Sequence, residues 1–102
     1  MRRLLMATAA LGLLASPAFA HCDSMDGPVV ADAQRALEAQ DITPVLKWVT
    51  AEDEDEIQSA FDMTLEVRDE TDAAKAVADQ YFFETLVRVH RASEGEGFTG
   101  LK

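Results

Sequence analysis

Apolar residues recur every three or four positions in three separate stretches of the chain, which is the spacing of one buried face of an α-helix. The stretches cover residues 30–40, residues 51–68 and residues 73–92. No stretch shows the strict alternation of apolar and polar residues that is typical of a half-buried strand. The pattern predicts an all-α fold, a small up-down helical bundle of three to four helices over residues 29–92.

Polar residues at the ends of these stretches predict where the helices begin. Thr43-Pro44 predicts a short extra helix, with Thr43 as the N-cap and Pro44 as the first helical residue. Thr50 is the expected cap of the helix that follows, and Thr71 or Asp72 the expected cap of the last one.

The acidic run at residues 52–56 has two interpretations. It predicts the first turn of a helix, where carboxylates meet the positive end of the helix dipole. A cation site is the alternative interpretation. The C-terminal tail, residues 93–102, contains three glycines and is expected to be irregular, with Phe98 and Leu101 docking on the bundle.

The first 20 residues have the pattern of a secretory signal peptide. Two arginines follow the first methionine, residues 4–14 are mostly apolar, and residues 18–20 form a small-x-small cleavage site. The apolar run is too short to span a bilayer, which takes about 20 apolar residues. The prediction is therefore export to the periplasm or the extracellular space, with cleavage after Ala20.

The net charge and the cysteine count limit which classes of partner the processed chain can have. The net charge is −10, and removal of the two N-terminal arginines makes it −12. Nucleic acid is a poor partner for such a chain, and we expect no membrane association after processing. The single cysteine excludes an internal disulfide. Because so small a core is only modestly stable, we expect a homo-oligomer.

Cleavage after Ala20 creates a group of metal-binding atoms that the precursor lacks. The new terminus, His21-Cys22, offers an α-amine, an imidazole, a backbone amide and a thiol within two residues. Mixed nitrogen and sulfur donors in a plane suit nickel or copper better than tetrahedral zinc. The sequence thus predicts a transition-metal segment over residues 21–28.

The segment His-Cys-Asp-Ser-Met-Asp-Gly at residues 21–27 resembles the nickel hook of nickel superoxide dismutase, whose mature chain starts His-Cys-Asp-x-x-Cys-Gly. Residues 78–85 are more weakly similar to a segment of the last helix of that enzyme. The whole sequence also looks like a group of small exported bacterial proteins with this hook-like start. The resemblance implies a hexameric four-helix bundle that binds nickel through the N-terminal amine, the first cysteine amide and thiolate, the second cysteine thiolate and the histidine.

One substitution separates this chain from that family. Asp26 stands where the hook has its second cysteine. A carboxylate is a harder and weaker nickel ligand than a thiolate. The resemblance therefore predicts nickel bound by His21, Cys22 and Asp26, with altered or absent dismutase activity, and whether the protein is an enzyme stays open.

Two other functions stay open at this point. A copper histidine brace would use His21 together with His90 from the last helix. A non-metal interaction protein would use exposed aromatic side chains, and Cys22 would then be a free or bridging thiol.

Several of these residues also have purely structural interpretations. Asp23 and Asp26 are candidates for capping the next helix. His90 is expected to interact with the helix dipole or with solvent, and Glu84 to pair with Arg88. The aromatic residues expected in the core or at an interface are Trp48, Tyr81, Phe82 and Phe83.

Overall fold

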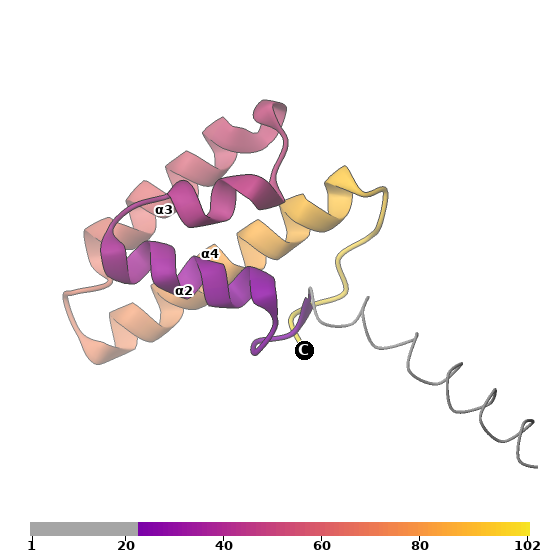
Figure 1. Ribbon diagram of the computed structural model, residues 1–102. Coiled ribbons are helices and arrows are strands. Elements are labelled where there is room, and N and C mark those ends of the chain that lie inside the picture. The colour runs from indigo at the N-terminus through magenta and orange to yellow at the C-terminus, as the bar shows by residue number, and fades with distance from the viewer. Residues whose placement is uncertain (1–22) are drawn as a thin grey trace, which may run out of the picture.

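The structure of the protein is a computed structural model that describes residues 23–102. The elements, in chain order, are α2 (Pro28–Ala39), the 3-10 helices η2 (Thr43–Trp48) and η3 (Ala51–Asp53), α3 (Glu54–Val67) and α4 (Asp72–Ser93). Figure 1 shows α2 and α3 lying along α4. No strand occurs in the described part of the chain, so the predicted all-α bundle is confirmed.

The core lies where α4 meets the two shorter helices. Phe82, Leu86 and Val87 of α4 are fully buried, and the ring of Phe82 lies 5.4 Å from that of Phe61 on α3. Phe98 and Leu101 of the tail pack against this core, as expected, although the tail has no regular structure. Each of the three α-helices thus turns an apolar stripe inward, which accounts for the spacing of three and four in the sequence.

The first helix begins at a proline and ends in a left-handed residue. Its N-cap is Gly27, so neither Asp23 nor Asp26 occupies the cap position. At the other end Gln40 has φ 55°, and its backbone N–H bonds the carbonyls of Ala36 and Leu37. A non-glycine residue in this region carries a conformational cost, because its Cβ crowds the backbone.

The predicted caps are correct at the last helix and wrong at the short one. The Thr71 side chain accepts a hydrogen bond from Ala74 N at 2.9 Å. Ahead of η2, however, the acceptor is Asp41, whose Oδ1 lies 3.0 Å from Thr43 N and 2.7 Å from its Oγ1. These bonds lower the pKa of Asp41. Thr43 thus lies inside η2, whose N-cap is Ile42.

The acidic run spans η3 and the first turn of α3, as its dipole interpretation predicts. Glu54, Asp55 and Glu56 occupy the first turn of α3. Thr50 is the N-cap residue of the preceding η3, but its side chain does not cap the helix. Its hydroxyl instead donates to the carboxylate of Asp53 at 3.2 Å.

Across residues 23–102, no helix combines the length and the apolar character needed to cross a membrane.

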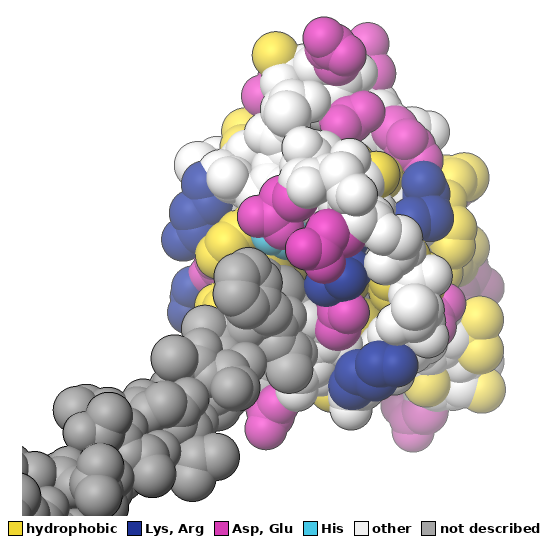
Figure 2. Space-filling view, turned by 90° about the vertical axis from the view of Figure 1, so that its right-hand side faces the viewer, with side chains coloured by type: hydrophobic (Ala, Val, Ile, Leu, Met, Phe, Trp, Pro, Cys, Tyr) yellow, Lys and Arg dark blue, Asp and Glu magenta, His cyan; other side chains and the backbone are white. Residues whose placement is uncertain are grey.

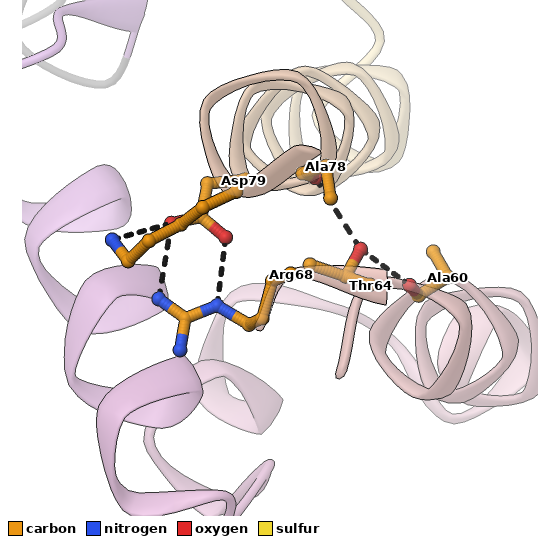
Figure 3. A network of polar contacts seen from close by, with 6 residues as sticks. Ala60, Thr64, Arg68, Ala78 and Asp79 are labelled. Carbon is orange, nitrogen blue, oxygen red and sulfur yellow. Dashed lines mark hydrogen bonds and ion pairs between the residues drawn. The ribbon is translucent and has the colours of Figure 1, made fainter. Parts of the chain in front are cut away.

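A buried ion pair joins α3 to α4 near their connecting turn (Figure 3). Arg68 donates to both carboxylate oxygens of Asp79, from Nε at 2.8 Å and from an η-nitrogen at 3.0 Å, and Lys75 adds a bond of 3.2 Å. Beside it, the hydroxyl of Thr64 donates to Ala60 O at 2.8 Å and lies 3.4 Å from Ala78 O.

The charges of this pair are well compensated. Burial would raise the pKa of Asp79, but the hydrogen bonds from Arg68 and Lys75 outweigh it and hold that pKa below its usual value. The same contact raises the pKa of Arg68. Both oxygens of this carboxylate are therefore occupied by the protein itself.

Candidate functional site

The described chain begins at Asp23, the residue that follows the predicted metal-binding pair in the sequence. His21 and Cys22, like the predicted signal peptide, lie outside the described residues. Asp23, the next residue, is 6% exposed, and its carbonyl oxygen accepts a hydrogen bond from Lys102 N at 2.7 Å. Figure 1 shows the C-terminal end lying beside the start of the described chain. Both ends of the described chain therefore meet at one edge of the bundle.

One arginine in the last turn of α4 connects three segments at this edge. An η-nitrogen of Arg91 lies 3.2 Å from Asp23 Oδ2, and the other lies 2.6 Å from Glu96 Oε2. Its Nε donates to Gly97 O at 3.1 Å. The Arg91 side chain is only 15% exposed. A largely buried guanidinium thus ties the start of the described chain to the C-terminal tail.

The second oxygen of the Asp23 carboxylate has no such partner. Oδ1 is buried and accepts no hydrogen bond within the described structure. Asp32 offers a comparison, because its Oδ1 also lacks a hydrogen bond but forms an ion pair with Arg35. Buried polar atoms are nearly always satisfied, so Asp23 Oδ1 is an exception that calls for an explanation.

Asp26 has a different environment from Asp23. It is exposed, and its carboxylate accepts a hydrogen bond from the Ser24 hydroxyl. A turn surrounds it, since Gly27 N donates to Ser24 O at 3.0 Å. The residue at the position of the hook's second cysteine is therefore on the surface of a short turn.

His90 is buried in the last turn of α4, so of its two predicted surroundings, the helix dipole and solvent, solvent is excluded. It is 8% exposed, and its Nδ1 lies 2.7 Å from Trp48 O. The two rings pack edge-on, with centroids 5.3 Å apart, and Nε2 lies 3.4 Å from Glu94 Oε1. The cause is η2, which places Trp48 against the end of α4. A copper brace would have to compete with these contacts.

The surface pairing expected along the last helix is also different. Arg88 bonds Glu56 on α3 at 2.5 Å, while Glu84 accepts from Gln80 at 3.3 Å. A contact between helices thus replaces the expected one within α4. Within residues 23–102, no three His, Cys, Asp or Glu side chains gather in a metal-binding group.

A shallow apolar groove lies between α3 and α4, away from this edge. It has a volume of about 730 Å³. Four large apolar side chains line the groove and are each at least 43% exposed: Met63, Val67, Val77 and Tyr81. The predicted placement of Phe82 and Phe83 in the core is confirmed, whereas Tyr81 is 43% exposed.

Charged side chains of both signs lie over the face shown in Figure 2, where acidic groups predominate over basic ones.

The contact between Asp23 and Arg91 was not predicted from the sequence. Asp23 was expected only as a possible cap, and Arg91 has no sequence signal beyond a basic residue in a last helical turn. Their contact spans most of the described chain, so only the fold brings them together.

Comparison with other proteins gives one match. No curated protein and no solved structure matches the sequence. One family model matches residues 26–102, which include the turn at Asp26 and all the described helices. The chain therefore belongs to DUF6448, a family of unknown function.

Proposed function

We propose that the protein is an exported metal-binding protein that holds nickel at its processed N-terminus. His21 supplies the α-amine and imidazole, and Cys22 supplies an amide nitrogen and a thiolate. A neighbouring carboxylate completes the set, and Asp26 is the residue that the hook resemblance assigns to this role. The proposal includes cleavage after Ala20, because only cleavage frees the amine.

The observation that supports this site is the anchoring of the residue next to it. Asp23 is held on its backbone by Lys102 and on its side chain by Arg91. Chain ends are usually poorly ordered unless they are tied down. An anchored Asp23 ties the point where the proposed metal-binding pair joins the chain to the bundle. This pre-organisation favours a defined binding site over a frayed end.

The described residues also fit a bound cation electrostatically. Asp23 and Glu96 share the single guanidinium of Arg91, so this group carries a formal charge of −1. The orphaned Asp23 Oδ1 adds an acceptor without a donor. When bound, nickel would supply a Lewis-acidic and redox-capable centre. With one thiolate in place of two, we propose metal binding with altered or absent dismutase activity.

A nickel titration of the chain that starts at His21 tests this function. We expect one tightly bound equivalent and a thiolate-to-nickel charge-transfer band. A chain with one glycine added before His21 is the matched control, and Cys22→Ser removes the thiolate. Each should lower the affinity by more than about 100-fold, because loss of an outer-shell partner alone costs 10–100-fold. Equal affinity in the glycine-extended chain would refute the proposal.

We also propose that copies of the chain associate, and the groove between α3 and α4 supports this. Contiguous exposed apolar surface often marks an interface. Sedimentation of the wild-type chain should show an oligomer, and Val77→Lys, at a residue 73% exposed, should shift it to the monomer. A wild-type chain that is monomeric at high concentration would contradict this proposal.

A further inference from the structure

We infer that the groove between α3 and α4 binds a basic amphipathic helix of another protein. The apolar face of that helix lies in the groove, and its Lys or Arg side chains meet acidic residues at the edges. The inference uses only residues of α3 and α4, so it is independent of the N-terminal metal. It bears on the proposed association of copies, because one groove cannot hold both occupants at once.

The first argument is the shape of the groove. Its floor is made of small, buried side chains, and Figure 3 shows Thr64 of α3 facing Ala78 of α4 there. The walls are large, exposed apolar side chains: Met63 and Val67 on α3, and Val77 and Tyr81 on α4. Each wall thus has two residues one helical turn apart. An amphipathic helix presents its apolar anchors with the same spacing when it binds in a groove.

The second argument is the charge at the edges of the groove. Glu66 of α3 lines it, and Asp62 lies one turn before Glu66. On α4, Val77 and Tyr81 also line a second hollow, whose edge is Glu84. All three carboxylates are exposed, and none forms an ion pair with a described residue.

The basic residues of the same two helices cannot neutralise these edges. Each Lys and Arg between residues 54 and 93 is already in an ion pair elsewhere: Arg68, Lys75, Arg88 and Arg91. None of the four lines the groove. The edges therefore keep an uncompensated negative charge, which lysines or arginines flanking an apolar stripe would complement.

The same charges disfavour other occupants. A second copy paired through this groove would bring Glu66 and Glu84 of both chains together, and like charges across an interface are destabilising. An anionic lipid surface would meet the same repulsion. A basic helix, by contrast, is attracted over a distance by a chain whose net charge is −10.

Calorimetric titration of the purified protein with designed peptides tests the inference. The probe is a peptide of about 18 residues with leucines on one helical face and lysines elsewhere, because shorter isolated helices are marginal in water. One control peptide has glutamate in place of each lysine, and the other has the same composition in scrambled order. We expect the probe to bind about tenfold more tightly than either control.

Variants of the protein show where the probe binds. Val77→Ser removes an apolar anchor at a residue 73% exposed, so the fold is retained and affinity should fall about tenfold. Glu66→Gln with Glu84→Gln keeps the shape of the edges and removes their charge, which should lower affinity about fivefold. The matched control, Glu38→Gln with Glu52→Gln, removes two exposed carboxylates outside α3 and α4 and should change affinity by less than about twofold.

Three results would overturn the inference. If the glutamate peptide binds as tightly as the lysine peptide, the charge at the edges does not select the partner. If Val77→Ser binds the probe as tightly as the wild type, the probe lies elsewhere. If the two double variants lose affinity equally, the probe responds to net charge and not to the groove.

Sedimentation of the protein with the probe distinguishes a helix from a second copy as occupant. We expect monomers with bound peptide, because the probe displaces any copy from the groove. An oligomer that persists without binding the probe would show that a second copy covers the groove, and the inference would be wrong.

Discussion

Two buried arginine–aspartate pairs each have one member on α4, and they differ in how completely the carboxylate is bonded. In the pair between Arg68 and Asp79, both oxygens accept hydrogen bonds from the arginine and Lys75 adds a third. In the pair between Arg91 and Asp23, only one oxygen has a partner among the described residues. Burial alone therefore does not distinguish these pairs, because both aspartate side chains are at most 12% exposed.

The difference indicates different roles. A carboxylate that the protein satisfies completely holds two helices together and has no capacity for a ligand. A carboxylate that is buried but half satisfied is less favourable for folding alone, and a bound cation would complete it. The pair near the α3–α4 turn therefore holds two helices together, whereas the pair at the chain ends ties the start of the described chain to the C-terminal tail.

The largest expected effect is at the structural pair. Arg68→Ala leaves Asp79 with Lys75 alone, and we expect a loss of about 3–5 kcal/mol in the free energy of unfolding, because one partner of a buried pair is removed. Urea denaturation measures this. The double variant Arg68→Met with Asp79→Leu should recover most of the loss. A single variant as stable as the wild type would show that the pair is not structural.

Acid should weaken the same pair. Because the pKa of Asp79 is lowered in the folded state, its contribution is complete above the unfolded-state value of about 3.9. That contribution is lost as the pH falls through the lower folded-state pKa. The free energy of unfolding, measured from pH 6 to pH 2, should therefore fall less steeply in Asp79→Asn than in the wild type. Parallel curves would contradict this prediction.

The pair at the chain ends should matter less for stability. Arg91→Ala removes contacts to Asp23, Glu96 and Gly97, but these groups can reach water when the ends loosen. We expect a loss of about 1–2 kcal/mol, smaller than for Arg68→Ala. Hydrogen exchange should show faster exchange at the Lys102 amide, which bonds Asp23 O. A slow Lys102 amide in this variant would mean that Arg91 does not hold the ends together.

The smallest effect is a gain at the C-terminal end of α2. Gln40 has φ 55°, a conformation that glycine adopts without strain. Gln40→Gly should raise the free energy of unfolding by about 0.5–1 kcal/mol. Its nickel affinity should equal that of the wild type, because Gln40 does not contact the chain ends. A change in affinity would show that the bundle and the metal site are coupled.

The fold was largely predictable from the sequence, because its signals are local. The three apolar stretches, the Thr71 cap and the acidic start of α3 all lie within a few residues of the structure that they determine. The cap ahead of η2 was assigned to Thr43 because a threonine before a proline resembles an N-cap. Asp41 competes for the same backbone amide and accepts the bond instead.

The site was predictable only in part, because its contacts are distant in sequence. The chelating start of the processed chain follows from two adjacent residues, but the prediction for it stays untested. The contact of Arg91 with Asp23 and that of His90 with Trp48 join segments tens of residues apart. No local pattern distinguishes Asp23 from Asp26, whereas the fold buries the first and exposes the second.

The proposed metal site exists only if the cell produces a chain that begins at His21. The measurement is intact-mass spectrometry under native conditions of the protein purified from the compartment to which we propose that it is exported. We predict a chain that begins at His21 and carries one nickel ion. A chain that begins at any other residue, or one that begins at His21 and stays metal-free when nickel is supplied in excess, would contradict the account.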